Sequence, residues 1–158
     1  MNVSPAAPER FEPQDPDYAG RCRGSFARQK AMKLIGGTLL ALEPGFCEVG
    51  LPFREDLTQQ KGFVHGGIVG MIADSACGYA AFSLMPAGCS LVTVEYKINI
   101  LAPALGNRLL ARGVVVRPGR TLTVARAEVY AESEGRSVHC ASMQQTLMML
   151  AGRSDHPD

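Results

Sequence analysis

The chain has 158 residues and a formal net charge of +1, from 16 Lys and Arg against 15 Asp and Glu. This length favours a single domain. Hydrophobic residues make up 46 % of the chain and charged residues 20 %, which excludes a largely disordered protein and a strongly basic nucleic-acid-binding tail. Aromatic residues make up only 6 %, Trp is absent, and the chain has 17 Gly and 7 Met. The core therefore has to be built from aliphatic, small and thioether side chains.

Cysteine usage and the N-terminal sequence indicate the compartment. The chain has five cysteines and no Cys-x-x-Cys pair, which argues against a disulfide framework or a zinc site and favours a reducing compartment. Residues 1–20 contain no apolar segment of the kind found in signal peptides. The uncharged stretch Ser75–Val94 is long enough to span a bilayer, but Pro86 and Gly88 interrupt it, so we interpret it as a helix, a turn and the start of a strand. We expect a cytoplasmic protein with no membrane partner.

The N-terminal segment predicts a tail followed by a helix. Residues 1–22 are Pro-rich and mostly acidic, which is typical of a flexible tail. From Arg21 to Lys33 the chain carries five basic residues and no acid, with apolar residues near helical spacing. This pattern predicts one short amphipathic helix, with Ser25 as a candidate cap and Gly36 after its last turn. We interpret its charges as a solvated basic face.

Two strands and a second helix are predicted next. Thr38–Phe53 has strand character on both sides of a Pro44-Gly45 turn, and residues 54–62 are polar and predict a loop. Gly66–Met85 is the most helix-like segment of the chain. One of its faces is apolar and the other carries small residues rather than polar ones, so we expect this helix to be buried on most sides.

The rest of the chain changes to strand character. Short Pro- or Gly-containing separators divide it into four runs rich in Val, Leu, Thr and Ile, at Leu91–Leu101, Arg108–Val116, Thr121–Ala131 and Ser137–Leu150. This order predicts an α+β fold in which one curved antiparallel sheet wraps around a long central helix. We place the domain at residues 23–152 and a short C-terminal tail at residues 153–158.

Asp74 is the first candidate for chemistry, because it interrupts an otherwise apolar helix with no cation nearby. A buried, unpaired carboxylate is costly, and it is frequently found where a protein needs a base or a nucleophile. A solvent-facing Asp, or one satisfied by neighbouring backbone, is the alternative. We favour a carboxylate at the mouth of an apolar cleft.

The sequence His65-Gly66-Gly67 comes directly before that helix. Glycines there allow close approach of a ligand, and the amide groups of a helix N-terminus are suited to an oxyanion. Two to three helical turns separate this helix start from Asp74. Gln59, or Gln60 beside it, can donate a side-chain amide to the same carbonyl oxygen, although an ordinary solvated loop residue explains either one.

Thr93 and a set of arginines complete the candidates. Thr93 lies at the start of the first strand after the helix, where Thr is also a common strand residue. Five arginines lie in an acid-free stretch around the Pro118-Gly119 turn, and they suit either phosphate binding or simple solubility. The sequence contains no motif of a dinucleotide-binding loop, a P-loop, a zinc protease or a serine-hydrolase elbow.

Residues 25–151 resemble the hotdog-fold acyl-CoA thioesterases of the phenylacetate-pathway (PaaI-like) type. The resemblance is carried by Gln59-Gln60-Lys61-Gly62-Phe63-Val64-His65-Gly66-Gly67, followed by Asp74-Ser75-Ala76-Cys77-Gly78. In that family a central helix is wrapped by an antiparallel sheet, in agreement with the order of elements predicted above.

The resemblance implies a role for each matching residue. Asp74 matches the carboxylate that acts as nucleophile or general base, and Gly66 N–H matches the donor to the thioester carbonyl. Gln59 occupies the position of an Asn or Gln that assists that carbonyl. His65 supports the loop near the thioester sulfur. The neighbouring residues Gly67, Gln60 and Ser75 are expected to contact the substrate.

Thr93 falls where some relatives place the hydroxyl that positions the hydrolytic water. Other relatives keep this hydroxyl one helical turn after the acid, where this chain has Gly78. The family site lies at a dimer interface, and we expect the acid and the water-positioning residue on different subunits of a homodimer that assembles into a homotetramer. Arg117 and Arg120 are candidates for holding the phosphates of coenzyme A.

The sequence therefore predicts an acyl-CoA thioesterase that needs no metal and no cofactor beyond the coenzyme A of its substrate. Two alternatives stay open at this point. A non-catalytic acyl-CoA-binding hotdog module keeps the cleft without a base. A hotdog enoyl-CoA hydratase or dehydratase needs a His–acid pair, of which the sequence shows no Asp-x-Asn-x-x-His arrangement.

Overall fold

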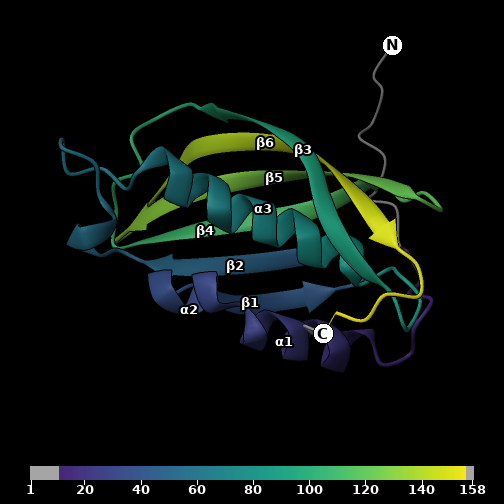
Figure 1. Ribbon diagram of the computed structural model, residues 1–158. Helices are drawn as coiled ribbons and strands as arrows, with labels where there is room; N and C mark the ends of the chain where they lie inside the picture. The colour runs from purple at the N-terminus through teal and green to yellow at the C-terminus, as the bar shows by residue number, and fades with distance from the viewer. Residues whose placement is uncertain (1–10, 156–158) are drawn as a thin grey trace, which may run out of the picture.

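Helix α3 (Gly66–Phe82) lies against one face of a six-stranded antiparallel sheet that curves around it (Figure 1). The computed structural model describes residues 11–155. The strand order across the sheet is β1-β2-β4-β5-β6-β3. The strands are β1 Thr38–Glu43, β2 Phe46–Pro52, β3 Ser90–Ile100, β4 Arg108–Arg117, β5 Leu122–Ser133 and β6 Arg136–Leu150. The predicted α+β architecture, a long helix wrapped by one curved antiparallel sheet, is confirmed.

The elements begin and end within a few residues of their predicted bounds. Gly45 and Gly135 adopt φ values of 78° and 67° in the β1–β2 and β5–β6 turns, a conformation that glycine adopts without strain. The predicted loop between β2 and α3 contains one 3-10 turn, η1 (Glu55–Leu57). Helix α3 ends at Phe82, before its predicted end at Met85. The hydroxyl of Ser83 donates to the carbonyl of Ala80 at 2.7 Å and accepts from Gly45 N–H at 2.8 Å, which ties the helix end to the β1–β2 turn.

The N-terminal region differs from the prediction of a single helix. Two helices form, α1 (Tyr18–Arg28) and α2 (Lys30–Ile35), because Gln29 between them has an extended backbone. Ser25 is no helix cap. It lies buried within α1, and its hydroxyl is 3.0 Å from that of Tyr79 in α3. Ser25, which the local pattern predicts as a helix cap, therefore makes a long-range contact between α1 and α3 instead.

The predicted tail includes residues that the structure places in α1. Tyr18–Cys22 form its first turns. Asp15, just before the helix, forms an ion pair with Arg21 at 2.7 Å. Arg21 also donates to the carbonyls of Phe82 and Met85, at 3.2 and 2.7 Å. These bonds fasten the start of α1 to the end of α3. Residues 1–10 of the predicted tail and residues 156–158 lie outside the described part of the chain.

The stretch Ser75–Val94 consists of the second half of α3, a connection and the start of β3, as expected. Among the described residues, no helix is long and apolar enough to cross a membrane.

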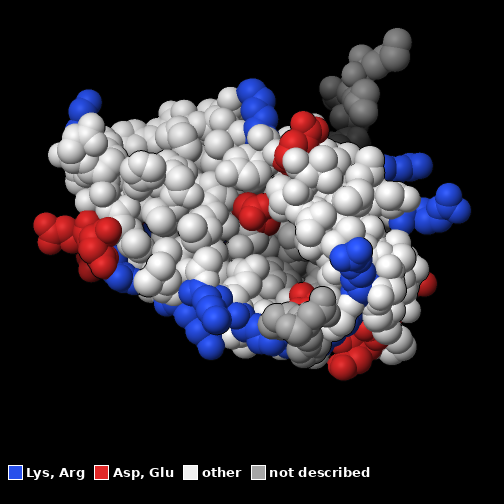
Figure 2. All heavy atoms as spheres, viewed as in Figure 1, with Lys and Arg blue, Asp and Glu red and all other residues white. Residues whose placement is uncertain are grey.

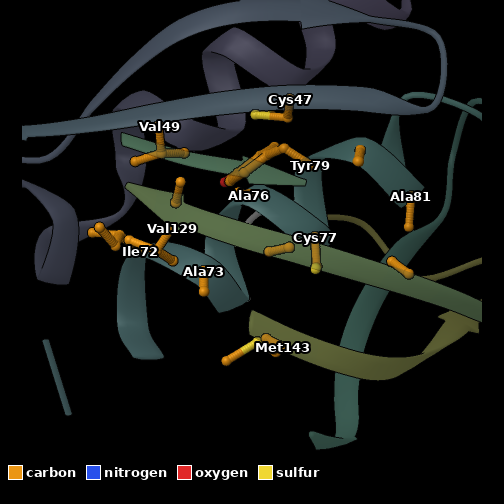
Figure 3. Close-up of a cluster of buried hydrophobic side chains, with 14 of the residues drawn as sticks. Cys47, Val49, Ile72, Ala73, Ala76, Cys77, Tyr79, Ala81, Val129 and Met143 are labelled. Atoms are coloured by element: carbon orange, nitrogen blue, oxygen red, sulfur yellow. The ribbon is translucent and has the colours of Figure 1, made fainter. Parts of the chain in front are cut away.

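The core lies where α3 meets the sheet (Figure 3). Ala73, Ala76 and Ala80 of α3 are fully buried. On β4 the facing residue is Gly113, which has no side chain at all. A Cβ atom there would lie 2.6 Å from the backbone nitrogen of Cys77 and closer still to the backbone of Ala76. The small residues counted in the sequence therefore let the helix backbone approach the sheet backbone.

This close approach gives a prediction about stability. We expect Gly113→Ala to lower the free energy of unfolding by about 1–3 kcal/mol, because the new methyl group overlaps helix backbone that cannot move aside. Gly24→Ala is the matched control. Its added methyl group, in α1, meets only the end of the Arg28 side chain at 3.6 Å, and alanine favours helix. Thermal and urea unfolding measure both variants. Equal stability of the two would contradict the packing described here.

Candidate functional site

A cavity of about 660 Å³ runs along the second half of α3. Its walls come from α3, from the start of β3 and from the α1–α2 region. The residues are Ser25, Ala27, Arg28, Gln29, Lys30, Lys33, Asp74, Ser75, Gly78, Tyr79, Phe82, Leu91, Thr93 and Asp155. Figure 2 shows this face of the molecule hollowed near its centre, with acidic atoms beside the hollow and basic atoms along the edge where α1 and α2 lie in Figure 1.

Asp74 and Thr93 meet at the wall of this cavity. The hydroxyl of Thr93 donates a hydrogen bond to Oδ1 of Asp74 over 2.7 Å. Asp74 is half-buried, and both residues line the cavity. Two residues that the sequence analysis selected separately therefore form one contact between α3 and β3.

The register of β3 explains how Thr93 reaches the helix. Thr93 lies opposite Leu147 of β6, and Tyr96 lies opposite Gln145, so Val94 is an extra residue between two regular stretches of pairing. Directly opposite residues of an antiparallel pair share one face of the sheet. A bulge at Val94 thus changes the alternation, and it keeps both Thr93 and Tyr96 on the face that carries α3.

One expectation about this pair is wrong. The resemblance led us to place the acid and the water-positioning residue on different subunits, whereas the Asp74–Thr93 hydrogen bond lies within a single chain. The cause is the adjacency of β3 to the second half of α3, which the order of elements in the sequence does not reveal.

Gln145 is a site residue that the sequence analysis missed. Its side-chain amide donates to Thr93 Oγ1 at 2.8 Å and also to Oδ1 of Asp74. It is 1 % exposed, in a row of β6 whose other inward residues, Met143 and Leu147, are apolar. The signal was present, because alternation from Met143 to Leu147 places Gln145 inward, but the adjacent Gln144 made the segment resemble an exposed one.

The N-terminus of α3 is organised by His65. Its Nδ1 atom accepts a 2.9 Å hydrogen bond from Gly67 N–H, so this amide belongs to the helix cap and is not available to a ligand. Gly66 N–H is different: no hydrogen-bond acceptor for it is found in residues 11–155, and the residue is exposed. Of the two glycines, only Gly66 offers the free donor that the sequence analysis expected.

Gln59 folds back on its own loop. Its backbone N–H donates to the carbonyl of Phe63 at 2.8 Å, and its side-chain Oε1 accepts from the backbone N–H of Lys61. Because the oxygen of the amide is used in this way, its NH₂ group is the part left for another acceptor. Gln60 is exposed.

The two groups of candidates lie apart within one chain. Gly66 and Asp74 are eight residues apart on α3, which corresponds to about 12 Å along the helix axis. The structure therefore brings Asp74, Ser75 and Thr93 to one cavity, with Gly66 and Gln59 at the far end of the helix. One thioester group is too small to contact both ends.

The basic residues of the cavity are not the expected ones. Arg117 and Arg120 are exposed near the β4–β5 turn and do not line the cavity that contains Asp74. Lys30 and Lys33 of α2 do line it, together with Arg28, whose guanidinium is paired with Asp155 at 2.6 Å. Arg117 and Arg120 stay a prediction for the coenzyme A phosphates.

Neutral polar groups also line the cavity, among them Ser25, Ser75 and Tyr79. Burial raises the pKa of Tyr79 to about 12, so its phenol is neutral at physiological pH and remains a hydrogen-bonding partner for Ser25. Ser75 donates a long 3.5 Å hydrogen bond to Gln29. The lining of the cavity therefore combines apolar side chains with neutral hydroxyl and amide groups.

The comparisons with known proteins identify the family of the chain. The family model of the thioesterase superfamily matches residues 61–138. A crystal structure of a thioesterase family protein from Silicibacter pomeroyi is 51 % identical, with a TM-score of 0.84 over 85 % of this chain and 99 % of that chain. “Putative esterase SSO2140” of Saccharolobus solfataricus is 33 % identical over 66 % of this chain and 73 % of its own length.

A more distant likeness concerns the fold. The E. coli PaaI protein from the phenylacetic acid degradation operon is 19 % identical, with a TM-score of 0.77 over 89 % of this chain and 98 % of that chain. The chain belongs to the thioesterase superfamily. Its class is that of the thioester hydrolases, on a single hotdog fold.

The five cysteines are free and buried, as expected for core residues. Burial raises the pKa of both Cys22 and Cys47 to about 12, and it also raises the pKa of Cys77, Cys89 and Cys140. A thiol with a raised pKa is protonated at neutral pH, and the thiolate is the reactive form.

These thiols should be silent towards Ellman's reagent in the folded protein. We expect native protein at pH 8 to release less than about one equivalent of the chromophore within minutes, because each thiol is both buried and protonated. Protein unfolded in guanidinium is the control and should react at all five cysteines. Rapid reaction of the native protein would show that a cysteine is accessible.

Proposed function

We propose that the protein hydrolyses acyl-CoA thioesters to a free acid and coenzyme A. The observation that carries the proposal is the Asp74 carboxylate, held by Thr93 at 2.7 Å in the wall of a 660 Å³ cavity. A carboxylate in such a place can take a proton from water, or attack the carbonyl carbon itself. Membership of the thioesterase superfamily supports the reaction class.

Each residue of the site has one role in the proposed reaction. Asp74 accepts a proton from a water molecule whose oxygen attacks the thioester carbonyl carbon, with Thr93 orienting that water. Gly66 N–H and the Gln59 amide donate hydrogen bonds to the carbonyl oxygen as it becomes negative. The C–S bond then breaks, the acid is released, and the departing thiolate takes up a proton. If Asp74 attacks directly, the C–S bond breaks as the thiolate of coenzyme A leaves, and a mixed anhydride forms on Asp74. A water molecule oriented by Thr93 then attacks this anhydride, which releases the free acid and restores the Asp74 carboxylate.

The acyl group lies, in this proposal, in the cavity beside α3. Gly78, Tyr79, Phe82 and Leu91 are among the residues that line it. The helix from Asp74 to Phe82 extends for about 12 Å, which is enough for a medium-length or aromatic acyl group. Gly78 widens the space, since a side chain there would point toward Leu91.

A second copy of the chain is needed to complete the site. Because about 12 Å separates Gly66 from Asp74 along α3 in one chain, the carbonyl donors must come from one subunit and the acid from the other. Strand β3 is at the edge of the sheet, and its apolar residues Val92, Val94, Tyr96 and Ile100 are between 42 and 54 % exposed. An exposed apolar edge strand suits pairing with another copy. We propose a homodimer through β3, which assembles into a tetramer in the cytoplasm.

The role of Asp74 can be tested directly. We expect Asp74→Asn to fold normally and to lose thioesterase activity by about 10²–10⁴-fold, because the amide cannot accept the proton of water. A thiol-release assay over short, medium, long and aromatic acyl-CoAs measures the activity and identifies the acyl group. Asp56→Asn, an exposed acid in η1, is the control. Full activity of Asp74→Asn would remove this residue from the mechanism.

The role of β3 gives an independent prediction. Val94→Lys places a charge on the apolar edge, so we expect loss of the dimer and a parallel loss of activity, with the fold of each subunit preserved. Val116→Lys is the matched control, because Val116 is 49 % exposed on β4, an interior strand of the sheet that does not pair with β3. Size-exclusion chromatography with light scattering gives the oligomeric state. A fully active monomer would contradict the shared site.

A further inference from the structure

We infer that Gln145 is a positioning residue for the reaction, which holds the carboxylate of Asp74 and the hydroxyl of Thr93 in their working orientation. The inference rests on the proposed function of Asp74 and extends it to a residue of β6. Gln145 does not line the cavity that contains Asp74, so it acts through these two residues and not on the substrate.

The placement of Gln145 is unusual for its residue type. The side chain is 1 % exposed, and the strand neighbours directly opposite it are Tyr96 on β3 and Ala125 on β5. An apolar residue at this position would continue the row of Met143 and Leu147. Glutamine is rarely buried so completely unless its amide has specific partners.

Its partners are the two residues already assigned to the site. The Nε2 atom donates to Thr93 Oγ1 at 2.8 Å and to Asp74 Oδ1, and Thr93 donates to that same Oδ1 at 2.7 Å. Both donors converge on one carboxylate oxygen. Within residues 11–155 no donor is found for Oδ2, so this second oxygen is the one left for water or substrate.

The amide also decides where the threonine proton points. Since Thr93 Oγ1 accepts from Gln145, its own proton is directed to Asp74, and one acceptor position of the hydroxyl remains for a water molecule. Without Gln145, the hydroxyl can rotate and the carboxylate can turn. Gln145 thus fixes which group donates and which accepts in the hydrogen bond between Thr93 of β3 and Asp74 of α3.

This arrangement carries a cost that a purely structural residue would not need. The Oε1 atom of Gln145 is buried and has no hydrogen-bond partner among the described residues. Leaving a buried acceptor unsatisfied lowers stability, and a leucine or methionine would avoid that loss. The amide is therefore retained at the expense of stability, as expected for a residue that serves the site.

The test compares Gln145→Leu with Gln144→Leu, the same change one residue earlier on the exposed face of β6. In the full-length protein we expect Gln145→Leu to keep or raise Tm, to lower kcat by about 10²-fold and to leave KM nearly unchanged. Gln144→Leu should keep parental kcat. Gln145→Met, which preserves the length of the side chain, is measured beside them in case the leucine variant does not fold.

A double-mutant cycle separates positioning from a general effect on structure. In the Asp74→Asn background, single-turnover hydrolysis should change by less than about two-fold on adding Gln145→Leu or Gln145→Met, because the group they act through is already gone. An equal loss in both backgrounds would overturn the inference. So would parental kcat in a folded Gln145 variant. If Asp74→Asn itself keeps full activity, the proposed function fails first, and that result is distinct from a failure at Gln145 alone.

Discussion

The close approach of α3 to the sheet is the constraint on which the rest of the molecule depends. Between Gly113 and the backbone of Ala76 and Cys77 there is no room for a methyl group, so the helix presents small residues to the strands beneath it. Polar side chains are then confined to the flanks of the helix. Asp74 points toward β3, where it contacts Thr93, and Ser75 points toward Gln29. Both residues line the cavity. The packing of the core thus determines which positions on α3 can carry the polar side chains of the site.

The same helix separates the two halves of the proposed chemistry. Its first turn is capped by His65, which uses Gly67 N–H and leaves Gly66 N–H free, whereas the acid sits about two turns further on. A rigid rod of this length cannot bend to bring its own ends together. In the proposed mechanism, activity therefore depends on association, and the apolar edge of β3 supplies a reason for two copies to meet.

Much of the fold could be predicted because its signals are local. The Pro44-Gly45 turn, the alternation of the strands and the apolar length of α3 each lie within a short window, and Asp74 stands out as the one charge in that helix. The misses depend on contacts between distant segments. The break at Gln29, the burial of Ser25 against Tyr79 and the inward position of Gln145 follow from packing, which local patterns do not record. The pairing of Asp74 with Thr93 in one chain has the same origin.

The bulge at Val94 divides β3 into two parts that contact different regions of α3. Residues before it, such as Thr93, belong to the cavity, and residues after it meet the opposite end of α3 near Gly70, where Tyr96 lies. Deleting Val94 would leave a regular strand with the same pairing partners, whereas deleting a residue after it would turn every later side chain of the strand to the other face. The number of residues in this strand is therefore as important to the enzyme as their identity. Along β3, substitutions should be tolerated more readily during divergence than insertions or deletions.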